Sequence, residues 1–386
     1  KVDAESFLKK NIGSVFSVES LEKKPIKKSP SAPFTTSTLQ QEASRKLYFS
    51  VSKTMTVAQR LYESGLITYM RTDSVTLSNT AKDSARDHIL KSYGNQYSRL
   101  KSYKTKTKGA QDAHEAIRPT NFSMLGDNIG DNDQKRLYQL IWKRTIASQM
   151  TDASLEKTNV KIKSSNHDIL FSSTGQIVKF DGFLKVYSEA KGDGVEEENS
   201  MLPKIELNEN LEFTYIKGTQ KFSRPPFRYS EASLVKKLED LGIGRPSTYA
   251  PTISTIQNRG YVEKGTIEGE NRDYLQLILE NNEIKEITLQ QKVGSDKGKL
   301  VPTDIGIIVT DFLINHFENI MDYNFTASVE ENFDNIADGK QEWTSMMKDF
   351  YNKFHPVVED VSKNAERESG KRILGAHPKN NKEVSV

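Results

Sequence analysis

The 386-residue sequence contains no cysteine. This absence excludes a disulfide framework, and it excludes any zinc site built on cysteine ligands. It also fits a reducing compartment.

The sequence also has no apolar segment long enough to cross a membrane. The longest apolar runs, residues 305–309 and 312–314, fall far short of the roughly 18 residues that a span requires. Residues 1–17 have no continuous apolar core, so no signal peptide is predicted. The chain begins at Lys1 rather than at Met, which suggests a processed chain or an excised fragment. With 35% hydrophobic and 28% charged residues, we predict a soluble protein of two or three domains.

Several common enzyme signatures are missing too. There is no G-x-x-x-x-G-K-[ST] loop, so no ATP site is predicted, and neither a G-x-S-x-G elbow nor an H-E-x-x-H helix occurs. Asp131 and Asp133 superficially resemble a metal-binding acidic pair. Because they directly precede a helical pattern, we interpret them as a helix cap and predict no metal site in this chain.

Positive charge is concentrated locally. The formal net charge is only +3, but residues 99–108 hold five lysine or arginine residues and no acid. Such a run is either a solvated basic loop or part of a nucleic-acid surface, and both interpretations stay open.

Changes in hydrophobic periodicity divide the chain. After a lysine- and proline-rich connector at 23–35, four helices are predicted, at 39–49, 54–63, 78–93 and 133–150. Alternating patterns from about 152 to 216 predict a β-rich region. Three late helices are predicted near 303–320, 326–338 and 341–365.

Between these regions lies a helix-turn-helix pattern. Two helical segments, 230–241 and 247–258, flank the tight turn Gly242–Pro246, and a strand begins at Tyr261. Helix, turn, helix and a β wing predict a winged-helix DNA-binding unit.

The predicted fold class is therefore multidomain α+β. We expect a β-rich arch formed by 1–28 and 153–222, with a helical domain at 29–152 inserted into it. A winged-helix and helical domain at 223–370 and a disordered tail at 371–386 complete the predicted order.

The segment 65–74, GLITYMRTDS, carries the clearest chemical signature. Alternate side chains of an extended segment share one face, so Arg71 can reach a phosphate that Tyr69 attacks. A phenol titrates near ~10 in solution, so a nucleophilic tyrosine needs cationic neighbours or a base. Most tyrosines serve packing, and this chain has 15, so the interpretation depends on the surrounding motifs.

Those motifs resemble the bacterial type IA DNA topoisomerases. The segment 65–74 is similar to the family's active-site signature, in which the tyrosine forms a transient 5′-phosphotyrosine. The methionine that follows the tyrosine, Met70, resembles the relaxing enzymes of the family, because the decatenating sister family more often has proline at this position. Other segments resemble the family in the same order along nearly the whole chain: APFTTSTLQQ at 32–41, QRLYE at 59–63, AHEAIRP at 113–119, the stretch 227–261 with SEA at 230–232 and GIGRPSTYA at 242–250, and YNFTA at 323–327.

The resemblance implies roles for the matched residues around the tyrosine. Tyr69 would be the nucleophile, and Arg71 would hold the scissile phosphate. His114 would bind a DNA phosphate or bias a nearby proton. Arg118 would contact the DNA backbone or brace its own motif.

A second group of residues would bind DNA at the start of the second helix of the winged-helix unit. Ser247 and Thr248 lie where free N–H groups and the helix dipole favour a phosphate, and Arg245 adds charge beside them. Ser247 can equally be a plain helix cap, and the two roles are compatible.

The resemblance also implies a missing part. In the family, an N-terminal Toprim domain supplies a glutamate, a lysine and an acidic cluster that binds Mg²⁺, and this sequence contains none of them. We therefore expect the Mg²⁺ ligands of the full enzyme to lie outside this chain, which itself binds no cofactor. The chain is expected to bind single-stranded DNA but to cleave it poorly or not at all alone.

For the full enzyme, the resemblance implies ATP-independent relaxation of negatively supercoiled DNA by cleavage of one strand, strand passage and religation. The domains would form a toroidal gate around a hole for duplex DNA. The expected partners are a single-stranded DNA segment that is cleaved and a DNA duplex that passes through the gate. No binding to a membrane is expected. A monomeric, cytoplasmic and nucleoid-associated protein is expected.

Two other classes of protein account for parts of this sequence. A non-catalytic winged-helix DNA-binding protein would account for 230–262 but leaves the motifs at Tyr69–Arg71 and His114–Arg118 unused. A tyrosine recombinase requires arginines and histidines clustered around a C-terminal tyrosine, whereas Tyr69 lies early in the chain.

Overall fold

The computed structural model describes residues 1–104, 114–190, 202–365, 373–376 and 383–385. Among these residues, no helix combines the length and the apolar character that crossing a membrane would need.

A helical unit surrounds the tyrosine signature. Its helices are α2 (Thr36–Leu47), α3 (Val51–Glu63), α4 (Asn79–Tyr93) and α5 (Asn132–Ser148), with a short 3-10 turn at Asn95–Tyr97. α4 and α5 begin within one residue of their predicted starts, whereas α2 and α3 begin three residues earlier than predicted. The Ser78 side chain caps α4 by accepting from the Ala81 N–H, and Asp131 caps α5 by accepting from the Gln134 N–H at 2.8 Å. The interpretation of Asp131 as a helix cap is confirmed.

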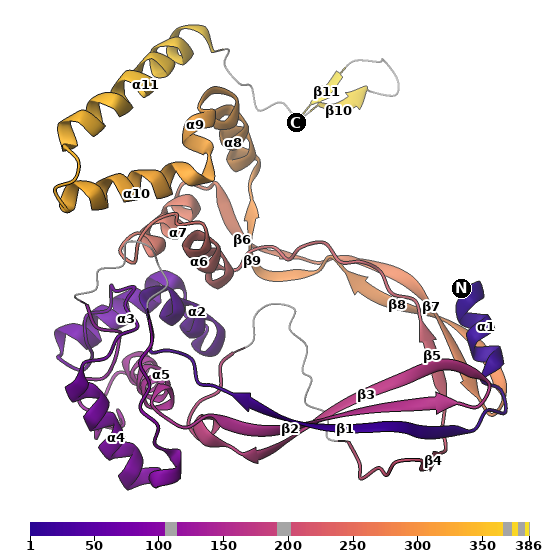
Figure 1. The fold of residues 1–386 in the computed structure, drawn as a ribbon. Helices are drawn as coiled ribbons and strands as arrows, with labels where there is room; N and C mark the ends of the chain where they lie inside the picture. The colour runs from indigo at the N-terminus through magenta and orange to yellow at the C-terminus, as the bar shows by residue number, and fades with distance from the viewer. Residues whose placement is uncertain (105–113, 191–201, 366–372, 377–382, 386) are drawn as a thin grey trace.

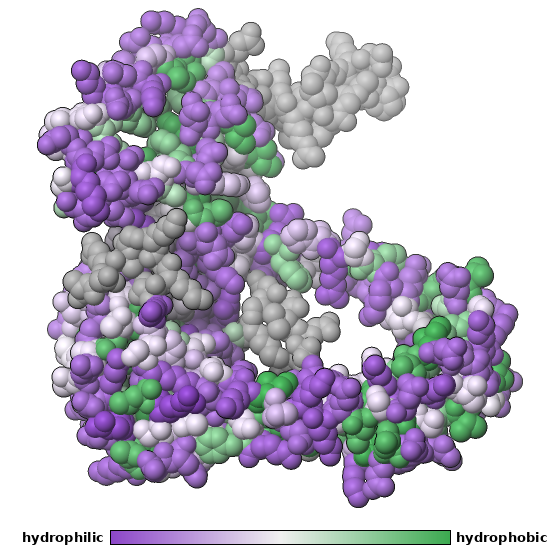
Figure 2. Space-filling model, viewed as in Figure 1, coloured by the Kyte–Doolittle hydropathy of each residue, from purple (hydrophilic) through white to green (hydrophobic). Residues whose placement is uncertain are grey.

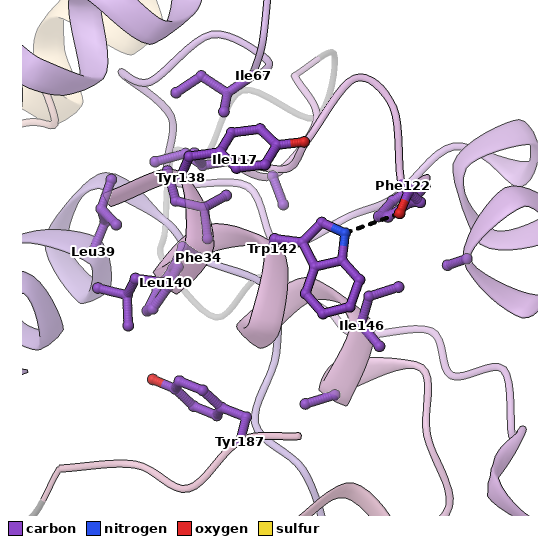
Figure 3. Packing of buried hydrophobic residues seen from close by; sticks show 14 of the residues in the cluster. Phe34, Leu39, Ile67, Ile117, Phe122, Tyr138, Leu140, Trp142, Ile146 and Tyr187 are labelled. Carbon is purple, nitrogen blue, oxygen red and sulfur yellow. Dashed lines mark hydrogen bonds between the residues drawn. The ribbon is translucent and has the colours of Figure 1, made fainter. Parts of the chain in front are cut away.

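The same unit contains the largest hydrophobic core of the described chain. α5 runs through its centre, with Tyr138, Ile141 and Ile146 fully buried (Figure 3). The Trp142 indole is also buried, and its Nε1 donates a hydrogen bond of 3.0 Å to the Phe122 carbonyl. Burying that polar atom is tolerated because it keeps a partner.

An antiparallel sheet forms the lower arm in Figure 1. It consists of β1 (Phe16–Lys28), β2 (Ala153–Ser164), β3 (His167–Phe180) and the short β4 (Asn210–Leu211), in the order β3-β2-β1-β4. The β1–β2 pairing runs from Phe16 opposite Ser164 to Lys28 opposite Ala153. The chain therefore leaves this sheet and returns to it at adjacent positions, with the helical unit between them.

The second arm is a long hairpin. β7 (Glu270–Glu280) pairs with β8 (Glu283–Val293) and with β5 (Ile216–Thr219). Near the tip of the hairpin, Leu277 and Leu279 pack on Leu8 of α1 (Val2–Lys10). β7 and β8 lie within the predicted winged-helix and helical domain at 223–370. The structure instead joins their far ends to the arch, because their pairing partner and apolar contacts lie there.

The winged-helix unit and the late helices follow. α6 (Glu231–Asp240) and α7 (Tyr249–Asn258) pack beside a small sheet of β6 (Val262–Ile267) and β9 (Asp296–Pro302). The Ser230 hydroxyl caps α6. Four helices complete this part of the chain: α8 (Asp304–His316), α9 (Glu318–Met321), α10 (Tyr323–Ala337) and α11 (Trp343–Asn364).

The predicted disordered tail is only partly in the described chain. Within 371–386, β10 (Ile373–Ala376) and β11 (Glu383–Ser385) form an antiparallel pair. This pairing corrects the prediction for those residues, since backbone hydrogen bonds between the two segments replace an irregular tail. The remaining positions lie outside the described residues.

The two arms and the helical units form a ring (Figure 1). One closure is the packing of α2 and α3 on α6 and α7, around a cluster that includes Val51, Val235 and Ile253. The other closure is the contact of α1 with the β7–β8 hairpin. The space-filling view leaves an open passage between the arms (Figure 2). The predicted multidomain α+β fold class is confirmed.

Candidate active site

The segment after α3 presents its side chains alternately to the core and to solvent. Gly65, with φ of +71°, ends α3, and the Leu66 N–H returns to the Leu61 carbonyl at 2.9 Å. Beyond it, Met70 and Thr72 are buried, whereas Tyr69 is 39% exposed and Arg71 is exposed. Tyr69 and Arg71 therefore share the outer face, as the extended pattern predicts.

The inner residues of this segment are anchored on one side by α2. The Thr36 hydroxyl donates to the Met70 carbonyl at 2.7 Å and accepts from the Thr72 N–H at 2.9 Å. The Thr36 N–H donates to the Thr72 carbonyl at 2.8 Å. The backbone on both sides of Arg71 is thus fixed to the first turn of one helix.

The other side of the segment is anchored by residues 116–118. The Thr68 N–H donates to the Arg118 carbonyl at 2.9 Å, and the Thr68 hydroxyl donates to the Ala116 carbonyl at 2.7 Å. The Arg118 N–H returns a bond of 2.9 Å to the Thr68 hydroxyl. Tyr69 consequently lies between two residues whose backbones are both held.

Two rings lie near the Tyr69 phenol. Tyr62 of α3 meets it edge-on, with ring centroids 5.3 Å apart, and the His114 ring lies 6.4 Å away. The structure therefore brings together Tyr69 and His114, two of the predicted site residues. The distance between the two rings leaves room for His114 to contact a phosphate or a proton near the phenol, which is its predicted role.

Arg71 faces a groove of about 640 Å³ between α3 and α7. The α3 wall includes Gln59, Arg60 and Glu63, and the opposite wall includes Ser247. Within the described part of the chain, Arg71 forms no ion pair, so its guanidinium is available for a phosphate. The two arginines give the groove the charge that an extended DNA backbone would require.

Arg118 braces its motif instead of facing the groove. Its Nη2 donates to Glu115 at 2.7 Å, and its Nη1 donates to the Pro119 carbonyl at 3.0 Å. Glu115 also accepts from the Ser78 N–H at 2.6 Å, which ties the motif to the start of α4. Burial opposes ionisation of Glu115, but the bonds from Arg118 and Ser78 prevail and lower its pKa. The geometry favours the bracing alternative of the predicted role.

Arg245 lies beside the groove but is already paired. Its Nη2 donates to Asp334 at 2.9 Å, and its Nε lies 3.3 Å from Glu330, both on α10. A narrow space next to it is lined by Asp73 and Glu239. Any phosphate that reaches this guanidinium competes with carboxylates.

Burial of these two carboxyls affects their protonation. It raises the pKa of Asp73, although the charges of Arg245 and His114 oppose the rise. It also raises the pKa of Glu239, against the effect of a 2.6 Å hydrogen bond from the Ser37 hydroxyl. The junction between α2 and α6 therefore contains acids that are costly to ionise.

Ser247 and Thr248 lie in the exposed turn before α7. Thr248 is the first residue outside the helix, and its side chain makes no capping bond within the described chain. Its hydroxyl instead accepts from the Arg245 N–H at 2.8 Å. Ser247 does not occupy the capping position, so the plain-cap alternative for it does not apply, while its place in the groove wall stands.

The basic run at 99–108 is partly structural. Arg99 and Lys101 both pair with Asp152 near the start of β2. Lys106 and Lys108 lie outside the described residues. Arg99 and Lys101 therefore do not belong to a solvated loop. Their ion pairs with Asp152 connect the helical unit to the arm formed by β1–β4.

Sequence reasoning gave no role to Thr36 or Glu63. Thr36 lies in a threonine-rich stretch whose local pattern predicts a helix cap. Thr35 is the residue that caps α2. The Thr36 hydroxyl instead forms hydrogen bonds with Met70 and Thr72, which are 34 and 36 residues away in the sequence. A local sequence pattern cannot reveal such distant partners. Glu63 accepts from Gln59 at 2.6 Å, a spacing typical of one helix face.

No group of three or more histidine, aspartate or glutamate side chains in the described chain is arranged to hold a metal ion. The acids around Arg245 do not form such a group.

Comparison with known proteins agrees with these observations. The model of the DNA topoisomerase family matches residues 1–271 and 281–348. DNA topoisomerase 1 of Rickettsia bellii is 45% identical over 361 residues, which are 90% of this chain and 41% of that protein. A DNA topoisomerase 1 of Acanthamoeba polyphaga mimivirus is 42% identical over 96% of this chain and 46% of its own length.

A solved structure shows the same arrangement. Full-length topoisomerase I from Thermotoga maritima superposes with a TM-score of 0.76 at 34% identity, and the match covers 99% of this chain and 58% of that one. The chain thus spans less than half the length of the two relatives named above. The fold of this chain is therefore similar to that of the matched part of that structure.

Proposed function

The chain belongs to the DNA topoisomerase family, and on that premise we propose that it is the nucleophile-bearing part of a type IA enzyme. The observation that supports the proposal is the anchored segment at 68–72, which exposes both Tyr69 and Arg71 and places Arg71 at a groove. Tyr69 is 39% exposed, so DNA can reach its ring, and the residues on both sides of it are anchored.

The reaction proposed for Tyr69 is a transesterification. The phenolic oxygen attacks the phosphorus of one DNA strand, the bond from phosphorus to the 3′ oxygen breaks, and the 5′ phosphate stays on the tyrosine. The phenolic proton leaves, and the 3′ oxygen takes up a proton. The reversed reaction rejoins the strand, so the bond energy is conserved and relaxation needs no ATP. Relief of negative supercoiling provides the driving force for strand passage.

Each predicted site residue has a place in this scheme. Arg71 holds the scissile phosphate and compensates its developing charge. Arg245, Ser247 and Thr248 contact phosphates further along the strand, at the start of α7. His114 lies near enough to the phenol to bind a phosphate or influence a proton, and Arg118 keeps the segment in place.

The full reaction requires more than this chain. Phosphoryl transfer needs charge compensation at the leaving oxygen, and we place the Mg²⁺ that would supply it, with its ligands, in the part of the relatives that this chain does not span. The chain alone is proposed to bind single-stranded DNA and to cleave it weakly or not at all. In the full enzyme, duplex DNA would pass through the ring. We propose a monomer that acts in the cytoplasm on nucleoid DNA.

The test is a covalent-adduct assay with a single-stranded oligonucleotide labelled at its 3′ end, because a 5′-phosphotyrosine keeps that label on the protein. The full-length protein with Mg²⁺ should give a labelled band on a denaturing gel, and Tyr69→Phe should remove it. A 5′-end label should instead appear only in the released fragment. An adduct that survives Tyr69→Phe would refute the assignment.

The same assay on this chain alone addresses its competence. The expected result is binding in a native gel without an adduct in the denaturing gel. A strong Tyr69-dependent adduct from the chain alone would show that the missing part is dispensable for cleavage. Binding of DNA by a full-length protein that never forms an adduct would favour the non-catalytic winged-helix alternative.

A further inference from the structure

Thr36 is buried at the start of α2, yet its side chain plays no part in capping that helix. The cap is Thr35, whose side chain accepts from the Thr38 N–H. A threonine hydroxyl has one hydrogen to donate and two lone pairs to accept. The Thr36 hydroxyl donates to the Met70 carbonyl at 2.7 Å, with a longer contact of 3.1 Å to the Thr72 carbonyl, and it accepts from the Thr72 N–H at 2.9 Å.

These two bonds have a specific geometric effect. They join the backbone just after Tyr69 to the backbone just after Arg71, through one oxygen atom. The Thr36 N–H adds a third bond, to the Thr72 carbonyl at 2.8 Å. The side chain is fully buried, so no water replaces the hydroxyl cheaply if it is removed.

The first turn of α2 also contacts the winged-helix unit. Ser37, the next residue, donates to Glu239 of α6 at 2.6 Å and accepts from Gln41 at 3.0 Å. Adjacent residues of one helical turn therefore hold the nucleophile segment and the winged-helix unit.

We propose that Thr36 is a positioning residue for strand cleavage. It contacts neither the phenol nor the guanidinium, and it acts by fixing the backbone that presents both. This inference rests on the proposed function, because positioning has meaning only if Tyr69 attacks a phosphate. A displacement of about 1 Å in such a pair costs on the order of 100-fold in rate.

The experiment uses the full-length protein and separates rate from binding. Thr36→Val removes the hydroxyl at nearly constant volume, and Thr36→Ser restores it. Thr145→Val is the matched control, since Thr145 is also fully buried but its hydroxyl donates only within α5, to the Ile141 carbonyl at 2.9 Å. Adduct formation is measured in single turnover at saturating 3′-labelled oligonucleotide, and affinity by fluorescence anisotropy.

For Thr36→Val we expect cleavage to slow by roughly 10- to 100-fold while the dissociation constant changes by about twofold or less. Thr36→Ser should recover most of the rate. Thr145→Val should keep the wild-type rate even if its melting temperature falls. If Thr36→Val does not fold, Thr36→Ala against Thr36→Ser provides the same comparison of a missing and a present hydroxyl.

Two results overturn the inference. A wild-type cleavage rate in Thr36→Val, or in Thr36→Ala where Val does not fold, shows that the hydroxyl does not position the segment. Equal losses in rate and affinity, shared with Thr145→Val, reduce Thr36 to a stability role. If the unsubstituted full-length protein forms no Tyr69-dependent adduct, the proposed function fails first and the inference fails with it.

Discussion

The two walls of the groove are built differently. On the α3 side, Arg71 projects into the groove from a backbone whose flanking residues are hydrogen-bonded to the buried Thr36. On the α7 side, Ser247 and Thr248 lie in an exposed turn, and Arg245 is held by carboxylates of α10. One wall is preorganised for chemistry, whereas the other offers its cation only in exchange for existing ion pairs.

The same contrast extends to the supporting helices. The unit around α5 has a deep core, whereas α9 and α10 contain no buried residue among those described, and α11 buries only Met346. Rigidity at the candidate active site therefore comes from the helices that carry the tyrosine. The α8–α11 helices contribute surface and charge.

The largest expected effect tests this contrast in stability. Ile141→Ala in α5 should cost about 2–5 kcal/mol, because its side chain is fully buried. Ile307→Ala in α8, where 48% of the residue is exposed, should change stability by about 0.5 kcal/mol or less. Urea unfolding followed by far-ultraviolet circular dichroism, which reports the helices of both units, measures the two losses. Similar losses at both positions would break the contrast.

The next effect compares the two arginines in binding. Arg71→Gln should weaken binding of single-stranded DNA by roughly 10-fold and reduce the salt dependence by about one ion. Arg245→Gln should weaken it by about threefold or less, because Glu330 and Asp334 already neutralise the guanidinium. Anisotropy titrations at two salt concentrations provide both values. Equal losses would mean that Arg245 leaves its carboxylates when DNA binds.

The competition at Arg245 can be tested directly. Asp334→Asn removes one carboxylate that holds the guanidinium, so affinity for single-stranded DNA should rise by about two- to threefold. Glu331→Gln, on the same helix and without an ion pair in the described chain, is the control for a general loss of negative charge. The gain should vanish when Asp334→Asn is combined with Arg245→Gln. A gain that persists would point to long-range charge instead.

A smaller effect concerns pH at the junction of the two walls. Burial raises the pKa of Glu239, so the folded protein binds this proton more tightly than the unfolded chain. The stabilisation is complete below the unfolded pKa, near ~4.3, and is lost as pH rises through the raised folded value. Asp73 has the same sign, whereas Glu115 has the opposite one. Between pH 5 and pH 7.5, the melting temperature of the wild type should therefore fall more than that of Glu239→Gln. Equal changes in melting temperature for the two proteins would contradict this origin of the pH dependence.

The smallest effect is expected at Ser247. Its side chain is exposed in the groove wall and does not cap α7. Ser247→Ala should weaken DNA binding by about twofold or less and leave stability within about 0.5 kcal/mol. Anisotropy and thermal melting measure the two quantities. A loss as large as that of Arg71→Gln would assign the α7 wall a much larger share of recognition.

Much of the local structure could be predicted from the sequence, because its determinants are local. Ser78, Asp131 and Ser230 cap the helices that follow them, as their residue types favour. The alternation that exposes Tyr69 and Arg71 together was also predictable. Long-range pairing was not. The joining of β7 to β5 and the ion pairs of Arg245 with α10 depend on segments more than 50 residues apart, which periodicity does not connect.

The register of β1 with β2 has a consequence for how this protein reaches its fold. Lys28 and Ala153 are directly opposite each other, so zipping these strands together closes a loop that contains residues 29–152. Closing a loop of that length in a flexible chain is slow, since the entropic cost precedes the contacts that repay it. If the inserted helices collapse first, they bring the two strand ends together. We therefore expect refolding in which helical signal around α5 appears before strand pairing, and destabilising α5 should delay the arm as well.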